Sequence, residues 1–104
     1  MFSTFPHGSK PEFTQLFING KFVNAQKGGV LRPINPTTEE VIGEFQAGTK
    51  EDIDLAVEAA RTAFDKGPWG KSTPAERRRV LTRAADIIER DLEHIVAMES
   101  ANNG

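Results

Sequence analysis

The hydrophobic pattern changes character once along the chain, at Ala47-Gly48, and this change limits the folds that are open to it. Before this point, apolar residues come in short β-prone runs separated by turn-forming residues. After it, apolar residues recur with the spacing of an α-helix to the end of the chain. Strands followed by helices, without a return to strands, are typical of an α+β arrangement. We therefore predict an antiparallel β-meander followed by two or three helices.

The first half predicts a β-hairpin around Asn19-Gly20. Two β-prone runs, Leu16–Ile18 and Lys21–Val23, flank this dipeptide. Both central residues of a type I′ turn need positive φ, which Asn and Gly tolerate better than other residues. We therefore expect these two runs to pair as antiparallel strands.

A second β-prone part surrounds Asn35-Pro36. Residues 30–34 are expected to be extended, and the proline biases the residue before it towards extended geometry, which makes a corner. Residues 37–40 then form a turn, and polar and apolar residues alternate over residues 40–45, which predicts one more strand. These segments would complete the small meander, whose apolar faces need a cover.

The first predicted helix begins after Thr49, a favourable N-cap, and Asp52 at the third helical position completes a variant capping box. Gly67-Pro68 ends this helix because proline cannot continue it. The apolar residues fall on one face and are rich in alanine, which lets a sheet or a helix approach closely. They are Ile53, Ala56, Val57, Ala60, Ala63 and Phe64.

A second helix is predicted after Thr73, with Pro74 at its first position and Glu76 reaching back to the cap. An apolar pattern continues as far as Met98, but Asp91 can also cap a new helix. The sequence therefore leaves open whether one long helix or a break near residues 90–91 follows. The apolar face of the second helix comprises Val80, Leu81, Ala84, Ala85, Ile87 and Ile88.

Length and composition predict one small unit with a thin core. The 104 residues have the size of one small domain, and residues 15–104 contain no repeat, low-complexity tract or linker. Residues 1–14 contain Pro6, Gly8 and Pro11 among small polar residues and are expected to form a flexible N-terminal arm. Hydrophobic residues make up 38% of the chain, a modest share for a free-standing domain.

Charge and residue usage exclude several classes of function. The formal net charge of −2 argues against general nucleic-acid binding, which needs a basic footprint. No apolar run approaches the roughly 18 residues of a membrane span, so we expect no membrane partner. The chain has no cysteine, which rules out disulfides and a cysteine nucleophile within it. The first ten residues lack the apolar core of a secretory signal and the arginines of a mitochondrial presequence, so we expect a cytoplasmic location.

No reaction centre is visible, and we predict neither a catalytic nor a cofactor-binding residue in this chain. His7 and His94 have no second histidine or cysteine nearby and are expected to be solvated. The glycines form neither a G-x-G-x-x-G motif nor a P-loop. Lys71 and the three arginines at residues 77–79 make one basic cluster, which we interpret as a solvated helix face. Trp69 is expected to anchor the helix connection in the core.

Taken in order, these segments resemble the N-terminal segment of the NAD(P)-dependent aldehyde dehydrogenase family. Each motif is weak alone, but their order and spacing over residues 16–104 agree with the family pattern. The segments that carry the resemblance are LFINGKFV (16–23), INPTTEEVIG (34–43), EDID (51–54), AARTAF (59–64), PW (68–69), RRRVL (77–81), AADIIER (84–90) and ESANNG (99–104).

The resemblance implies a fold and an activity of which this chain holds only a part. It implies the N-terminal part of an α/β cofactor-binding domain, in a family that oxidises aldehydes to carboxylic acids with NAD or NADP and assembles as dimers or tetramers. The family's dinucleotide loop, general-base glutamate and nucleophilic cysteine are not among these residues. We therefore expect a truncated piece that binds no cofactor, is inactive and is marginally stable alone.

Two other functions stay open at this stage. The chain is alternatively a non-catalytic binding module that associates with full-length subunits, because its meander and its alanine-rich helix face both need a cover. A small nucleic-acid binder that relies on residues 77–79 is the third reading.

The resemblance also implies a candidate site for a monovalent cation. Many members bind such a cation through a backbone carbonyl in the segment that matches Ile34 and an aspartate in the segment that matches Asn102. Oxygen ligands suit hard cations. In this chain an amide stands where the carboxylate would be, which removes the charge attraction, so we expect Ile34 and Asn102 to give a weaker site.

Overall fold

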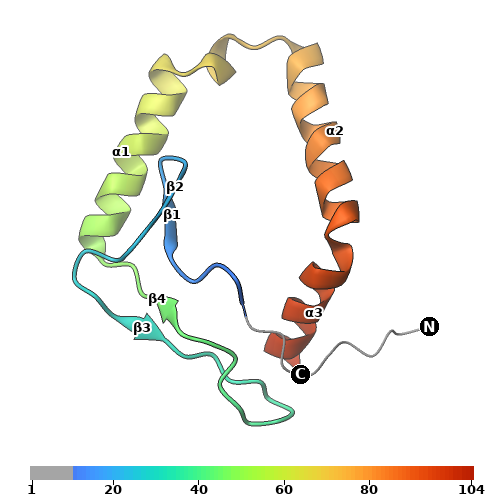
Figure 1. Ribbon diagram of the computed structural model, residues 1–104. Coiled ribbons are helices and arrows are strands. Elements are labelled where there is room, and N and C mark those ends of the chain that lie inside the picture. The colour runs from blue at the N-terminus through green and yellow to red at the C-terminus, as the bar shows by residue number, and fades with distance from the viewer. Residues whose placement is uncertain (1–10) are drawn as a thin grey trace.

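The computed structural model describes residues 11–104, so most of the predicted N-terminal arm lies outside the described residues. Within that range Figure 1 shows short strands followed by helices, in the order β1, β2, β3, β4, α1, η1, α2, α3. The helices form an arch that η1 closes at the top, and the strands lie between and below its two sides. The molecule measures 47 × 40 × 16 Å, and its radius of gyration of 17.4 Å exceeds the about 13 Å of a compact chain of this length.

β1 (Leu16–Ile18) and β2 (Lys21–Val23) form the predicted hairpin. Asn19 and Gly20 make its two-residue loop, and their φ angles of 53° and 74° confirm a turn that needs positive φ at both positions. The ring of Phe22 stacks on Phe13, with the two ring centroids 4.8 Å apart. The hairpin therefore contacts the segment that precedes it through its aromatic residues.

β3 (Val30–Leu31) and β4 (Phe45–Gln46) form a second hairpin that is separate from the first. The predicted antiparallel β-structure is therefore present as two hairpins, whereas the strand predicted over residues 40–45 was wrong in its bounds, because β4 begins at Phe45. Inside the long connection only an isolated bridge joins Ile34 to Val41. Backbone hydrogen bonds from Asn35 to Glu40 and from Ile42 to Pro33 also link the two sides of this connection, and Glu39, with a φ of 63°, lies in its turn. We call residues 34–43 the knuckle.

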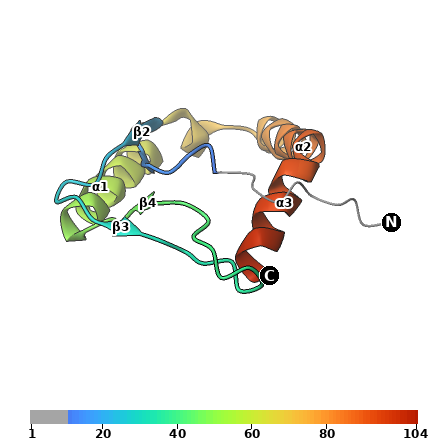
Figure 2. The same cartoon turned by 60° about the horizontal axis from the view of Figure 1, so that its bottom comes forward.

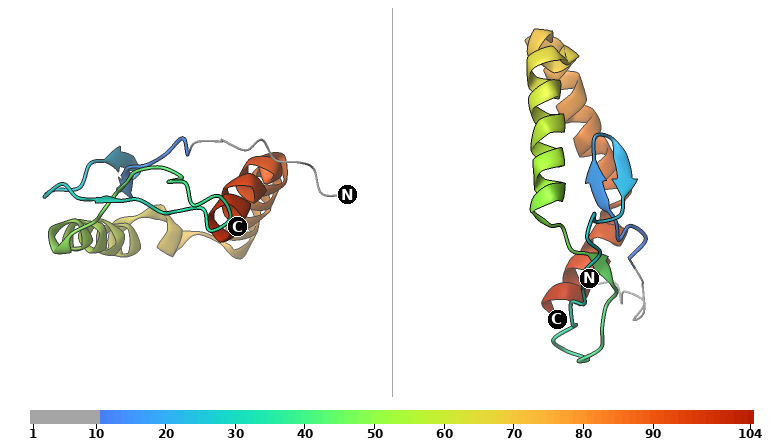
Figure 3. Two further views of the ribbon diagram at one scale, coloured as in Figure 1. Left: turned by 90° about the horizontal axis from the view of Figure 1, so that it is seen from below. Right: turned by 90° about the vertical axis from the view of Figure 1, so that its left-hand side faces the viewer.

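α1 (Lys50–Lys66) packs against β1, and its first turn has the predicted cap. The backbone N–H and the hydroxyl of Thr49 both donate to the carboxylate of Asp52, at 2.8 and 2.9 Å. The helix ends at Gly67, where a Cβ would collide with the carbonyl oxygen of Ala63. Figure 3 shows the first hairpin on one side of α1, while no other described element lies on the opposite side.

η1 (Pro68–Lys71) leads from α1 to α2 (Pro74–Arg90). The predicted reciprocal cap is present at the start of α2: Thr73 N–H donates to the Glu76 carboxylate at 2.6 Å, and Glu76 N–H donates to the Thr73 hydroxyl at 3.2 Å. Sequence chemistry alone therefore located the beginning of this helix.

α3 (Leu92–Asn103) begins after a break at Asp91, which decides between the two alternatives left open by the sequence. The side-chain cap expected of Asp91 is not formed. The Asp91 carboxylate accepts two hydrogen bonds from Arg90, each at 2.8 Å, and makes no cap hydrogen bond to α3. Gly104 closes α3 with a φ of 79°, as expected of a helix stop.

Very little of the described chain is buried. Of residues 11–104, only Ala25, Asp52 and Ala97 are buried, and every residue of α2 is exposed. The chain exposes 8700 Å², whereas a compact monomer of its mass exposes about 5800 Å². With only three buried residues among residues 11–104, the elements make an open layer without a closed core. In this range no helix has the length and apolar character needed to cross a membrane.

Candidate functional site

The start of α1 fastens together segments that are far apart in the sequence. We call this the α1 clamp, formed by Ala25, Gln26, Gln46, Thr49 and Asp52. Asp52 is 2% exposed; one of its oxygens accepts from Gln26 N–H at 3.0 Å and the other from Thr49. The side-chain oxygen of Gln46 accepts from Ala25 N–H at 3.0 Å. The clamp thus joins the loop after β2, strand β4 and the first turn of α1.

Hydrogen bonds favour the ionised form of the two acidic residues in the first turn of α1, Glu51 and Asp52. The backbone N–H of Thr49 is the main cause that lowers the pKa of Asp52, against the opposing effect of burial. The hydrogen bond from Lys27, whose Nζ lies 2.7 Å from Glu51, is the main cause that lowers the pKa of Glu51. Negative charge is also favourable near a helix N-terminus. Both carboxylates are therefore already engaged in contacts that stabilise the fold.

The knuckle is fastened to the C-terminal end of α3 (Figure 2). The side chain of Asn35 accepts from Thr37 N–H at 2.9 Å, which holds the tight turn. The hydroxyl of Thr37 then donates to the Gly104 carbonyl at 2.9 Å. A Cβ at Gly104 would lie 2.7 Å from Cγ of Pro36, so glycine permits this close approach.

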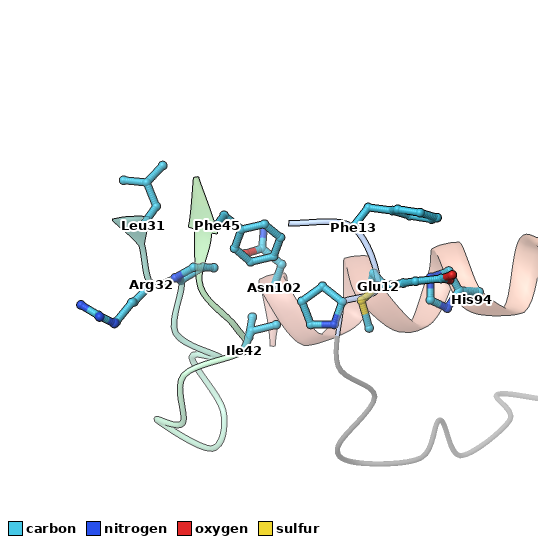
Figure 4. Close-up of a pocket in the computed structure, with 11 residues that line it drawn as sticks. Glu12, Phe13, Leu31, Arg32, Ile42, Phe45, His94 and Asn102 are labelled. Atoms are coloured by element: carbon cyan, nitrogen blue, oxygen red, sulfur yellow. The ribbon is translucent and has the colours of Figure 1, made fainter. Parts of the chain in front are cut away.

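A cavity of about 700 Å³ lies between residues 11–13, the second hairpin, the knuckle and α3 (Figure 4). Four polar side chains reach it, and one of them, Arg32, is already paired with Glu44 at 2.6 Å. No hydroxyl or thiol is present among the lining residues to act as a nucleophile. The cavity therefore offers mainly apolar contacts to any group that enters it. Its lining comprises Pro11, Phe13, Leu31, Pro33, Ile42, Phe45 and Met98, with Glu12, Arg32, His94 and Asn102.

The two residues of the predicted cation site lie on elements that contact each other. Ile34 begins the knuckle, and Asn102 lies in the last turn of α3 and lines the cavity. The hydrogen bond between Thr37 and Gly104 connects these two elements. Within residues 11–104, no group of three or more His, Cys, Asp or Glu is placed to hold a metal ion. A site made of carbonyl and amide oxygens is a different arrangement and stays a prediction.

The basic cluster of Lys71 and the three arginines at residues 77–79 was interpreted as a solvated helix face, and this holds only in part. Nε of Arg77 donates to the Ser72 hydroxyl at 3.0 Å, and its guanidinium donates to the Trp69 carbonyl at 3.2 Å and lies 5.4 Å from the ring centroid of Trp69. Arg77 therefore holds the η1 connection. Trp69 itself is 46% exposed, so the prediction that it anchors a core was wrong for this chain.

The described residues do not fit the phosphates of a dinucleotide. Phosphates bind at helix N-termini because the N–H groups and the helix dipole attract negative charge. Here the first turns already carry acids: Glu51 and Asp52 in α1, Glu76 in α2 and Glu93 in α3. Asp52 and Glu76 also accept the N–H groups of their own caps. No step of nicotinamide chemistry can therefore be assigned to these residues.

Comparison with known proteins decides the family. The model of the aldehyde dehydrogenase family matches residues 22–104. The chain belongs to this family. An aldehyde dehydrogenase of Alternaria alternata is 46% identical over 102 residues, which are 98% of this chain and 20% of the relative. Aldehyde dehydrogenase 1 of Tanacetum cinerariifolium is 45% identical over 93 residues, 89% of this chain and 19% of the relative.

A solved aldehyde dehydrogenase has the same arrangement of elements. The NAD+ complex of the Bacillus cereus enzyme superposes with a TM-score of 0.85 at 43% identity, over 89% of this chain and 19% of that one. The predictions of an N-terminal aldehyde dehydrogenase segment and of its α+β fold are confirmed. The chain spans about a fifth of the length of the relatives it matches.

Sequence reasoning missed the residues that connect distant segments. The spacing of Thr49 and Asp52 identified the cap, but nothing in it indicated that the second oxygen of Asp52 accepts from Gln26, 26 positions earlier. The contact of Thr37 with Gly104 spans 67 positions. No sequence signal was available for either contact, because both depend on where distant segments are placed.

Proposed function

We propose that this chain supplies the N-terminal scaffold of the cofactor-binding domain of an NAD(P)-dependent aldehyde dehydrogenase and has no dehydrogenase activity by itself. One observation carries the proposal: the chain matches the family over residues 22–104 but spans about a fifth of its relatives and contains no cysteine. The thiol nucleophile that the family resemblance implies must therefore come from elsewhere.

The open surface supports the role of a scaffold. On α1, Leu55 and Ala59 line the space beside the first hairpin, whereas Val57 and Phe64 are 62% and 71% exposed. At about 3.6 residues per turn these two pairs lie on opposite sides of the helix. An element with two apolar sides is normally covered on both of them.

The dehydrogenase activity is tested with the purified chain, NAD+ or NADP+, and aliphatic and aromatic aldehydes. We expect no reduced cofactor above the blank, because the nucleophile and the phosphate site are lacking. A full-length relative under the same conditions is the positive control. Steady turnover by the chain would overturn the proposal.

Cofactor binding is a separate measurement. The Bacillus cereus and Mycobacterium tuberculosis enzymes have structures described as complexes with NAD+. For this chain we expect no heat of binding when NAD+ or NADP+ is titrated, because acids occupy the first turns of its helices. Saturable binding would contradict this expectation.

The alternative function is a non-catalytic module that docks on full-length subunits. The exposed apolar side chains and the cavity of about 700 Å³ favour it. The test mixes labelled chain with a full-length relative, whose family resemblance implies dimers or tetramers, and follows both by size-exclusion chromatography. Co-migration supports the module, and separate elution excludes it.

We also propose a weak monovalent cation site at the Ile34 carbonyl and the Asn102 amide oxygen. Asn102→Asp would restore a charged ligand, so added potassium or sodium should then raise the thermal stability of the variant. Asn103→Asp is the matched control, and tetramethylammonium chloride keeps the ionic strength constant. An equal change in thermal stability of the two variants would contradict the proposed site.

A cytoplasmic location and the absence of a nucleic-acid partner are proposed on the grounds of sequence and charge. Some relatives, such as the Equus caballus enzyme, are described as mitochondrial, so location does not transfer from the family. Fractionation of cells that express the chain with a C-terminal tag tests the location. A salt-dependent mobility shift with DNA or RNA would contradict the second expectation.

A further inference from the structure

The chain contains two Asn-Gly pairs, and the structure places them in different surroundings. Asn19 and Gly20 form the exposed loop of the first hairpin, whereas Asn103 and Gly104 lie at the end of α3. The other three asparagines of the sequence are followed by alanine, proline and asparagine. In an Asn-Gly pair the backbone nitrogen that follows the asparagine is the least shielded, because glycine has no side chain. This nitrogen can attack the side-chain amide that precedes it.

Hydrogen bonds hold both reacting groups of the pair at the end of α3. The side-chain nitrogen of Asn103 donates to the Glu99 carboxylate, and the Gly104 N–H donates to the Ser100 carbonyl at 2.9 Å. An attack of the Gly104 nitrogen on the Asn103 side chain would have to break both hydrogen bonds. The negative charge of Glu99 also opposes the anion that forms when the attacking nitrogen loses its proton. This pair is therefore protected by its surroundings.

The pair in the hairpin loop lacks such contacts. Among residues 11–104, no group makes a hydrogen bond with the Asn19 side chain. Gly20 is exposed, and a Cβ added to it would have no atom of these residues within 4 Å. The space around the loop is therefore open.

The loop has to open before the two groups can react. In a type I′ turn the first loop residue has φ and ψ of about 60° and 30°, which directs the next nitrogen away from the side chain of that residue. Each strand of this hairpin has only three residues, and a two-stranded hairpin is marginally stable by itself. Local opening of such a loop costs little free energy.

We propose that Asn19 is a site of spontaneous deamidation. The deprotonated backbone nitrogen of Gly20 attacks Cγ of Asn19, a C–N bond forms, and the bond from Cγ to Nδ2 breaks as ammonia leaves. The product is a five-membered cyclic imide. Water then opens the imide at one of its two carbonyl carbons. Opening at Cγ gives aspartate, and opening at the backbone carbonyl carbon gives isoaspartate, in which the chain runs through the former side chain. The net reaction consumes one water and releases one ammonia.

Isoaspartate at position 19 loosens the first hairpin. It adds a methylene group to the backbone of a two-residue loop, and the length of the loop fixes the register of the two strands. Aspartate keeps the loop, because it tolerates the left-handed conformation as asparagine does. Either product changes the formal net charge from −2 to −3. Asp52 and Glu58 line the space beside Asn19, so the new charge is placed near other acids.

Peptide mass spectrometry of the folded chain, kept at mildly alkaline pH and sampled over time, tests the site. The chain carries a C-terminal tag, so that a peptide bond follows Gly104 as it follows Gly20. We expect Asn19 to convert about tenfold faster than Asn103, because two hydrogen bonds protect the second pair. Glu99→Ala should speed the conversion of Asn103 and leave that of Asn19 unchanged. Mildly acidic pH should slow the reaction at Asn19, because less of the attacking nitrogen is deprotonated.

NMR tests the effect on the hairpin through the contact between Phe17 and Phe22, which face each other across the two strands. This contact should be lost in the isoaspartate form, separated by reversed-phase chromatography and refolded, and kept in the Asn19→Asp variant treated in the same way. A contact kept in both would contradict the effect on the hairpin.

Two results would overturn the site itself. Conversion of Asn19 in urea but not in the folded chain would show that the closed turn protects it. Equal rates at Asn19 and Asn103 in the folded chain would show that the surroundings do not decide between the two pairs. Neither measurement depends on dehydrogenase activity, so this proposal and the proposed function can fail independently.

Discussion

The first turn of α1 and the whole of α2 show what local and distant interactions each contribute to this chain. Both helices have 17 residues and begin with a threonine cap that an acid at the third position completes. At α1 the acid, Asp52, also accepts from Gln26 and is buried. At α2 the acid, Glu76, accepts only from its own cap residue, and the helix is exposed throughout. The same local signal is thus part of a tertiary contact in one helix and stands alone in the other.

This difference predicts that the fold depends most on Asp52. Asp52→Ala removes the acceptor of the Gln26 and Thr49 N–H groups in a buried place, so it should cause the largest loss of helix content and thermal stability of the changes considered. Circular dichroism measures both quantities. Asp54→Ala, two positions along the same helix and exposed, is the control and should have little effect. Equal losses in the two variants would contradict the account of the clamp.

Acid should unfold the clamp through the same group. The pKa values of Asp52 and Glu51 are lowered in the fold from their ordinary 3.8 and 4.5. A lowered pKa stabilises the fold above the ordinary value and loses this effect as the pH falls through the lowered one. Helix content should therefore stay constant from pH 7 to about 4.5 and decline below it. A decline that begins near pH 6 would point to a histidine instead.

The cap of α2 should have a smaller and more local effect. Thr73→Ala removes the hydroxyl that accepts from Glu76 N–H, and loss of such a cap costs about 1 kcal/mol. Because α2 has no buried residue, faster amide exchange should appear in its first turns and leave the clamp unchanged. Hydrogen exchange resolved by NMR measures this, with Thr82→Ala in the same helix as control. Faster exchange in the clamp would show that the two regions are coupled.

The smallest effect is expected for an apolar residue of α2. Leu81 is 67% exposed, so Leu81→Ala in the dilute chain should change the free energy of unfolding by no more than about 0.5 kcal/mol. The same change at a buried leucine costs about 2–5 kcal/mol. Urea denaturation at low protein concentration measures it, and a loss above about 2 kcal/mol would show that α2 is packed.

Local chemistry allowed much of the fold to be predicted. The Asn19-Gly20 turn, both capping boxes and the end of α1 at Gly67 follow from the preferences of a few neighbouring residues. The prediction of a strand over residues 40–45 also relied on a local pattern, and it was wrong in its bounds. Alternation of polar and apolar residues is a weak signal, and over this stretch the structure has only an isolated bridge at Val41 before β4 begins at Phe45.

Contacts between distant residues could not be predicted in this way. The hydrogen bonds of Asp52 with Gln26 and of Thr37 with Gly104 depend on how whole segments are placed. The exposure of Trp69 has the same origin, because a tryptophan is buried only where another element covers it, and here Arg77 alone stacks on it. The family resemblance supplied the cation-site residues Ile34 and Asn102, which local chemistry did not single out.

Peptide-resolved hydrogen exchange on the dilute chain tests most directly the claim that this is a scaffold without a closed core, held mainly at the α1 clamp. We predict that the amides of Gln26 and Thr49 exchange slowest, and that those of α2 exchange at rates close to an unprotected helix. Equal protection of α2 and the clamp, lost together in one sharp thermal transition, would show a complete domain and contradict the account.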